Sequence, residues 1–138
     1  MWLFTRYGFF SIACAQKQNG TMDADTVMVR ARCREHLCNL QERVSALATY
    51  EIRLTPGRDY ACRIIVPKRV WADVLFDLAT EQEWSNFKNE VADFQGEGGA
   101  GYVHALHDVW ARMARLQVTK HGGRLQRNAD SSIINAED

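Results

Sequence analysis

The sequence predicts an α+β domain in which a four-stranded antiparallel sheet carries its helices on one face. Two pairs of segments alternate between apolar and other side chains, and a turn signal separates the members of each pair, so two β-hairpins are expected. A helical pattern follows each hairpin and a further one comes later, which gives the order ββα-ββα-α. Strands joined by short turns pair antiparallel, and helices that follow them cover one face of the sheet.

The first hairpin is expected between residues 9 and 32, with Asn19-Gly20 as the turn signal between its strands. One face of this hairpin would carry apolar side chains, namely Phe10, Ile12, Cys14, Val27, Val29 and Ala31. A helix is predicted next, over residues 33–47. Its apolar residues recur at spacings of three and four, at Leu37, Leu40, Val44 and Leu47.

The second hairpin surrounds residues 55–59, where Pro56 and Gly57 supply the dihedral angles of a turn. Pro67 then opens a second helix, because proline is well suited to a first helical turn. The buried face of that helix would consist of Val70, Trp71, Val74, Leu75 and Leu78. A further helix is expected over 101–117, burying Tyr102, Leu106, Val109, Met113 and Leu116. Residues 1–118 are thus predicted to form a single domain, and residues 119–138 a disordered polar tail.

The opening segment, MWLFTRYGFFSIACAQ, could be an export signal or a strand of a soluble domain. Arg6 interrupts the apolar stretch, and residues 9–15 alternate as a strand does, so we interpret the segment as a buried strand. The sequence contains no run of 18 apolar residues, so no membrane span is predicted and a cytoplasmic location is expected. In a reducing compartment the four cysteines would be thiols. Cys14, Cys33 and Cys62 are expected inside the domain and Cys38 outside.

Charge is balanced over the whole chain but not along it. Lys+Arg and Asp+Glu both total 17, so no global field attracts the protein to nucleic acid or to a membrane. Residues 1–70 hold 11 basic and 6 acidic side chains, a balance of +5, whereas residues 71–118 hold 3 basic and 8 acidic, a balance of −5.

Several motifs together resemble a family of small bacterial single-domain proteins of unknown function. They are W-L-F-T-R-Y-G-F-F-S near the start, V-R-A-R before a helix, T-P-G-x-D-Y followed by R-I-I-V-P, and N-F-K-N-E-V. The resemblance covers roughly residues 2–117. It implies a cytosolic single domain and assigns no activity, substrate or site.

Two groups of histidine and cysteine residues deserve a test as catalytic or metal sites. Cys33, His36 and Cys38 fall on different sides of a helix and cannot converge on one metal ion. His104 and His107 have no nucleophile or partner carboxylate placed beside them by the pattern. We therefore predict no catalytic residue, no metal site and no cofactor.

The face of the sheet opposite the helices holds the candidate ligand-binding residues. They are Arg30, Arg32, Arg53, Arg63 and Phe9. Arginines beside an aromatic ring on an open sheet suit an anionic ligand or single-stranded nucleic acid. An exposed antiparallel face must also be polar, so a purely structural face and a homodimer interface stay open. Neighbouring guanidinium groups need counter-charges from Glu51, from a second subunit or from a ligand.

The sequence favours a binding or regulatory module over an enzyme. The alternative is a small enzyme or metabolite-binding domain with its pocket between the helices and the sheet. An arginine-lined face that is open, or that forms an interface, would indicate the first function; a closed pocket with a titratable pair would indicate the second.

Overall fold

The computed structural model describes residues 1–117, 119–121 and 124–126 of the 138-residue chain. It divides into two compact units, Met1–Glu83 and Trp84–Asp138, each of which is described by itself. The expectation of one domain over residues 1–118 stays a prediction.

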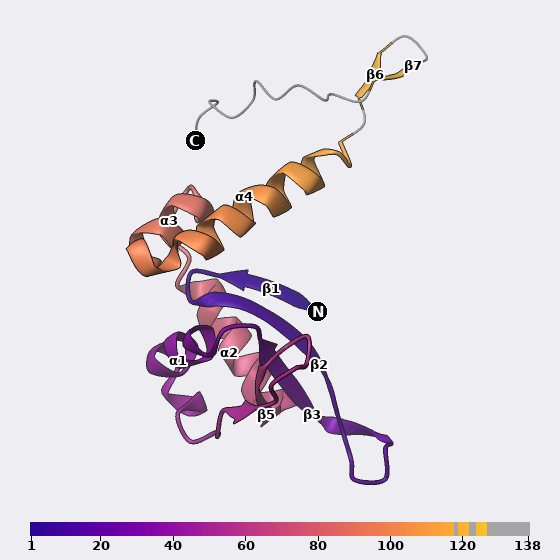
Figure 1. Cartoon of the computed structure of the whole chain (residues 1–138), viewed down its shortest axis with the longest axis vertical. Helices are drawn as coiled ribbons and strands as arrows, with labels where there is room; N and C mark the ends of the chain where they lie inside the picture. Colours follow the sequence, from indigo (N-terminus) through magenta and orange to yellow (C-terminus); the bar gives the residue numbers. More distant parts are fainter. Residues whose placement is uncertain (118, 122–123, 127–138) are drawn as a thin grey trace. The chain divides into compact units, whose positions relative to one another are not determined.

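The first unit contains one antiparallel sheet of five strands (Figure 1). The strands are β1 (Trp2–Thr5), β2 (Gly8–Gln16), β3 (Met22–Ala31), β4 (Arg53–Leu54) and β5 (Cys62–Pro67). Their order in the sheet is β1-β2-β3-β5-β4, and every neighbouring pair is antiparallel. The α+β class and the antiparallel sheet are confirmed, but the predicted count of four strands is wrong.

The additional strand is β1, which pairs with β2 across a tight turn at Arg6-Tyr7. Thr5 stabilises this turn, because its hydroxyl oxygen accepts hydrogen bonds from the backbone N–H groups of Tyr7 and Gly8, at 3.1 and 3.2 Å. Gly8 has a φ of +151°, a backbone conformation that residues other than glycine rarely adopt. Helix α1 (Arg34–Arg43) also comes close here, since a Cβ atom on Gly8 would clash with the ring of His36.

Helices α1 (Arg34–Arg43) and α2 (Lys68–Thr80) pack on one face of the sheet, the inner face. Of the predicted core residues of both helices, Val70 and Leu75 are only partly buried. The others are buried, namely Leu37, Leu40, Val44, Leu47, Trp71, Val74 and Leu78. Helix α1 ends earlier than predicted, because Val44 adopts an extended conformation and a 3₁₀ turn, η1 (Ser45–Leu47), follows.

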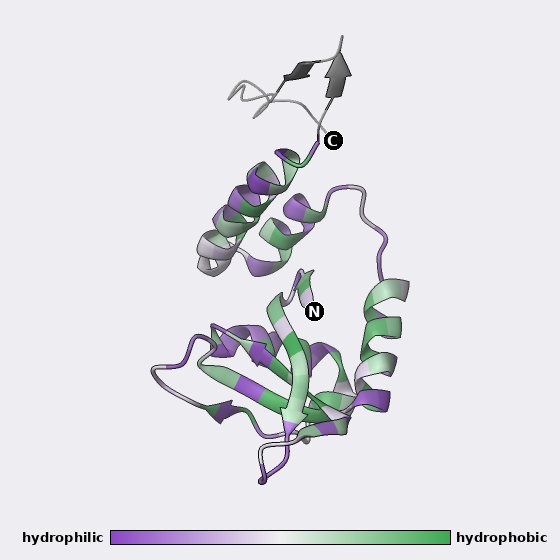
Figure 2. Cartoon of the chain, turned by 90° about the vertical axis from the view of Figure 1, so that its right-hand side faces the viewer, coloured by the Kyte–Doolittle hydropathy of each residue, from purple (hydrophilic) through white to green (hydrophobic). Residues whose placement is uncertain are grey.

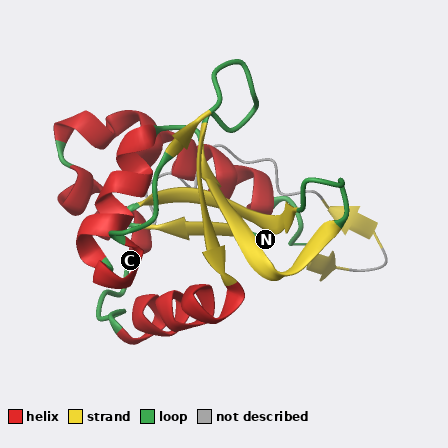
Figure 3. Cartoon of the chain, turned by 90° about the horizontal axis from the view of Figure 1, so that it is seen from below, coloured by secondary structure: helices red, strands yellow, loops and turns green. Residues whose placement is uncertain are grey.

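Alternation along the strands separates the two faces of the sheet. The inner face is apolar and buried against the helices; its strand residues are Phe10, Ile12, Val27, Val29, Ala31, Cys62, Ile64 and Val66. Figure 2 shows hydrophobic positions, in green, and hydrophilic positions, in purple, along the same strands and helices. Figure 3 shows the same sheet from below, with its strands in yellow.

Glu81 connects three elements at the end of α2. Its Oε2 accepts hydrogen bonds from the Tyr7 hydroxyl and from Nε of Arg43, both at 2.9 Å, and Nη2 of Arg6 lies 3.5 Å away. Burial raises the pKa of Tyr7, so its hydroxyl stays protonated and remains a donor to this carboxylate. The β1–β2 turn is thereby attached to both helices.

The second unit contains α3 (Phe87–Gln95), the 3₁₀ turn η2 (Glu97–Gly99), α4 (Ala100–Ala114) and the short strands β6 (Thr119–His121) and β7 (Arg124–Gln126). Asn86 caps α3, since its side chain accepts from the N–H groups of Lys88 and Asn89. The predicted disordered tail is described only at these two strands; positions 118, 122–123 and 127–138 lie outside the described residues.

The predicted apolar stripe is buried at Leu106 and half-buried at Tyr102. Val109 and Met113 in α4, and Leu116 just after its end, are exposed, contrary to expectation. The reason is length. At 1.5 Å per residue, α3 covers about 13 Å and α4 extends for about 22 Å. Within this unit, the end of α4 therefore has no helix opposite it in the described chain.

The cysteines also differ from expectation. Cys62 is buried, which raises the pKa of its thiol, but Cys33 is exposed at the N-cap of α1 rather than buried on that helix. Cys14 and Cys38 are half-buried, and all four are free thiols. Among the described residues, no helix is both long and apolar enough to cross a membrane.

Candidate ligand-binding face

The candidate site is the face of the sheet opposite α1 and α2. Strand register places five residues directly opposite one another along one line across the sheet: Trp2, Ser11, Arg30, Arg63 and Arg53, from β1 to β4. We call this region the arginine–aromatic face. It consists of Trp2, Phe4, Phe9, Arg30, Arg32, Arg53, Tyr60 and Arg63.

Arg30 and Arg63 are neighbours on β3 and β5 and are both half-buried. Nη2 of Arg30 donates to the hydroxyl of Ser11 at 2.7 Å. Nη2 of Arg63 donates to the Thr55 hydroxyl at 2.6 Å and to the Tyr60 carbonyl at 3.1 Å. These acceptors are neutral, so they orient the two guanidinium groups without balancing their charge.

Tyr60 is buried beside two of the arginines. The Cζ atoms of Arg30 and Arg32 lie 4.8 and 4.9 Å from the centre of its ring, which is cation–π distance. Arg32, directly after β3, also forms an exposed ion pair with Asp59 at 2.8 Å. The loop between β4 and β5 thus holds Arg30 and Arg32 in place through Tyr60.

Arg53 lies on the edge strand β4, opposite Arg63. It is exposed, and within the described part of the chain its side chain makes no hydrogen bond or ion pair. Its side chain is free to meet a ligand.

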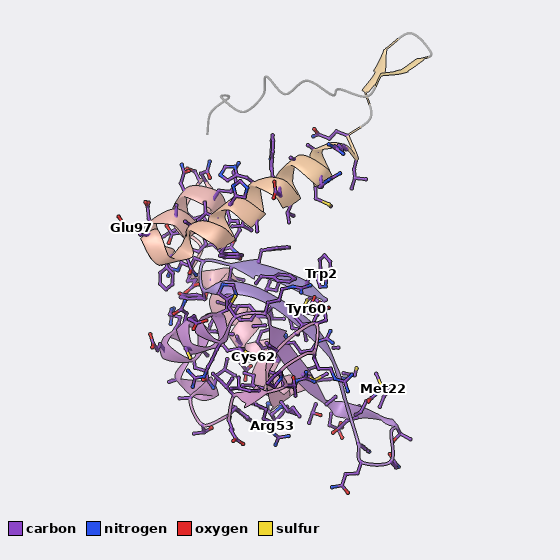
Figure 4. All side chains as sticks on the ribbon, in the orientation of Figure 1. Trp2, Met22, Arg53, Tyr60, Cys62 and Glu97 are labelled. Carbon is purple, nitrogen blue, oxygen red and sulfur yellow. The ribbon has the colours of Figure 1, made fainter. Side chains whose placement is uncertain are left out.

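Aromatic rings gather at the β1–β2 end of the face. Phe9 stacks on Phe4, with ring centres 4.7 Å apart, and meets Trp2 edge-on at 5.6 Å. Tyr60 lies 6.3 Å from Phe9, and Figure 4 shows Trp2 and Tyr60 near each other, with Arg53 farther along the molecule. Trp2 is 69% exposed, so aromatic surface is available to a ligand next to the arginines.

The electrostatics of the face are unbalanced. Like charges directly opposite one another across strands destabilise a sheet, and Arg30, Arg63 and Arg53 occupy three successive strands. In the described ranges, none of these three arginines has a carboxylate within 4.0 Å. Asp59 neutralises Arg32, and Glu51, one of the three possible sources of counter-charge, forms no ion pair in this part of the chain.

Sequence reasoning selected five of the eight residues, and the structure brings all five to one face. It missed Trp2 and Phe4 because β1 was not predicted. The alternation of Trp2 and Phe4 around Leu3, ahead of Gly8, was the available signal. It missed Tyr60 because this residue lies in a loop, where alternation gives no direction.

The other groups tested as sites do not assemble one. Cys33 is exposed, whereas His36 packs beside Gly8 and accepts a hydrogen bond from the N–H of Phe9 at 3.4 Å. His104 and His107 border an open depression of about 330 Å³ between α3 and α4, whose other lining residues are Ala92, Gly96, Ala100 and Val103. Residues 1–117, 119–121 and 124–126 contain no group of three side chains that could hold a metal ion.

No protein-family model, curated protein or solved structure matches this chain. The resemblance to small bacterial proteins stays a prediction. What the arginine–aromatic face can do follows from its own chemistry.

Proposed function

We propose that this protein is a binding module whose arginine–aromatic face binds the phosphate groups of a polyanionic ligand. One observation carries the proposal: Arg30, Arg63 and Arg53 lie opposite one another on three neighbouring strands without a carboxylate partner in the described chain. Adjacent strands are about 4.8 Å apart, so the backbone positions of this line span about 10 Å. That span suits several phosphates or one phosphate held by more than one arginine.

The chemistry of arginine supports phosphate over other anions. A guanidinium group is planar, stays charged, and offers paired N–H donors that match two phosphate oxygens. Arg30 and Arg63 are already oriented by Ser11 and Thr55, so little side-chain freedom is lost on binding. Arg53 has no such partner and would become ordered only with the ligand.

The test is a salt titration with a fluorescently labelled single-stranded oligothymidylate as the polyanion. Each neutralised phosphate contributes about −0.7 to the slope of log K against log salt, so three arginine contacts predict a slope of about −2. Arg53→Ala should lower the affinity and reduce the slope by about 0.7. It should not lower the melting temperature, because the Arg53 side chain makes no hydrogen bond or ion pair within the described residues.

The matched control is Arg69→Ala. Arg69 is exposed on α2, the helix that packs on the inner face, and its loss changes the net charge equally. The control should bind like the wild type. Equal losses in the two variants would show nonspecific attraction, and an absence of salt-sensitive binding at micromolar protein would contradict the proposal. A stable dimer in sedimentation, broken by Arg53→Glu in a protein that binds no polyanion, would identify the face as a homodimer interface instead.

A further inference from the structure

We infer that the polyanion is a single-stranded nucleic acid, one of whose bases stacks on Trp2. This inference rests on the proposed function, because the phosphates of the same strand would lie on the arginines. The observation behind it is that the exposed indole and the arginines share one line across the sheet, from Trp2 on β1 to Arg53 on β4.

Trp2 has the features of a stacking surface. It is 69% exposed, although large aromatic side chains are usually well covered. Phe9 supports it at 5.6 Å with nearly perpendicular ring planes, and Phe4 stacks on Phe9 in turn. The rings of Phe9 and Phe4 therefore support the indole from one side, while much of its own surface stays in solvent. Bases of any sequence can stack on such a ring, because each has a flat π surface.

Tyr60 has a different role, although it is aromatic and lies nearby. It is buried, and the guanidinium groups of Arg30 and Arg32 lie over its ring at cation–π distance. Its ring positions the arginines and is not available to a base. The face thus separates into a base-stacking part at Trp2 and a phosphate-binding part at Arg30, Arg63 and Arg53.

This division selects among polyanions. Trp2 lies two strands from Arg30, about 10 Å along the sheet, so a ligand must present a flat ring and phosphates at separate positions. Polyphosphate and anionic lipid surfaces have no such rings, and a duplex keeps its bases stacked inside. A single strand offers both groups together, with its bases free to turn outward.

The experiment compares three ligands of equal phosphate number: an oligothymidylate, an abasic strand with the same sugar–phosphate chain, and a duplex. The wild type should bind the oligothymidylate about tenfold more tightly than the abasic strand, the size expected for one stacked base. Trp2→Ala should abolish this preference and leave affinity for the abasic strand unchanged. Trp2→Phe should retain part of the preference, because phenylalanine keeps a flat ring.

Two control variants separate stacking from charge and from general effects. Arg53→Ala should weaken binding of the oligothymidylate and the abasic strand by the same factor. Trp110→Ala removes another exposed tryptophan, on α4 in the second unit, and should change neither affinity.

The outcomes distinguish the two proposals. If the oligothymidylate and the abasic strand bind equally tightly with the expected salt dependence, the stacking inference is wrong and the proposed function stands. Duplex binding as tight as single-strand binding also overturns the inference. Loss of binding to both the oligothymidylate and the abasic strand in Trp2→Ala also overturns the inference, whether or not the melting temperature falls. Stacking predicts that the affinity for the abasic strand stays unchanged. If no ligand binds, the proposed function itself fails.

Discussion

The two faces of the five-stranded sheet are built from the same strands but differ in what they contribute. On the inner face, Val29 and Ile64 are fully buried against the helices. On the outer face, the adjacent residues on the same strands are Arg30 and Arg63, both half-buried and positively charged. The inner face supplies the apolar burial that stabilises the fold, whereas the outer face gathers like charges that the fold does not need.

This contrast separates stability from function. A sheet exposed on one side requires polar residues there, but it does not require three arginines opposite one another. Variants of the inner face should therefore change the free energy of unfolding, and variants of the outer face should change ligand binding.

The largest effect is expected for Ile64→Ala, with Ile65→Ala as its matched control. The two isoleucines are consecutive on β5, but Ile64 is fully buried and Ile65 only partly. Ile64→Ala should reduce the free energy of unfolding by about 2–5 kcal/mol, through lost burial and a cavity. Ile65→Ala should cost about 1 kcal/mol. Denaturant titration measures both values, and equal losses would contradict the assignment of the two faces.

Gly8→Ala tests the closest approach between the sheet and α1. The new methyl group would clash with the His36 ring, and the positive φ adds backbone strain, so a loss of about 2–3 kcal/mol is expected. Gly57→Ala provides the control, because Gly57 has a φ of +80° but no atom within 4 Å of a new Cβ. It should cost about 1 kcal/mol, from strain alone. If the two variants lose equal stability, the clash with His36 is not present.

The stability of the protein should also fall as the pH drops below about 6.5. Burial lowers the pKa of His36 in the folded state, and its Nδ1 accepts a hydrogen bond from the N–H of Phe9, so the neutral ring is preferred. The unfolded chain takes up this proton first, and folding loses stability between the unfolded and the folded pKa. His36→Gln should flatten the pH dependence of unfolding measured between pH 7.5 and 5.

The smallest effect is expected on the outer face itself, for Arg53→Glu. This change places an acid opposite Arg63 and replaces a like-charge pair by an attractive one. It should raise the free energy of unfolding by about 0.5 kcal/mol at low salt, and added salt should remove the gain. A loss of stability would mean that the line of arginines is not a source of repulsion.

The strand β1 is not predicted by the local sequence pattern. The tight turn at Arg6-Tyr7 carries none of the usual turn dipeptides, so residues 1–8 were not recognised as half of a hairpin. With β1 unrecognised, its outward residues Trp2 and Phe4 could not be placed beside Phe9. The sequence therefore predicts a candidate site of arginines with one aromatic ring, without the neighbouring rings of Trp2 and Phe4.

The predicted burial of the apolar residues near the end of α4 was wrong for another reason. Its apolar residues recur at helical spacing, which normally indicates a buried face. Burial also needs a neighbour of sufficient length, and α3 has only nine residues. Val109, Met113 and Leu116 are therefore exposed in the described structure although their pattern is that of a core helix.

Local patterns in the sequence show which residues share a face, because alternation in strands and spacing in helices follow from backbone geometry. These patterns are sufficient to predict an antiparallel α+β fold, a core containing Trp71 and Val74, and arginines gathered on the opposite side of the sheet. Strand order and register, by contrast, arise in the folded chain, where they place Arg30 opposite Arg63 and Arg63 opposite Arg53. The tertiary structure also places the ring of Tyr60, from a loop, against the guanidinium groups of Arg30 and Arg32. Such contacts depend on which segments, distant in the chain, meet in the folded protein. The local sequence pattern carries no information about these long-range contacts.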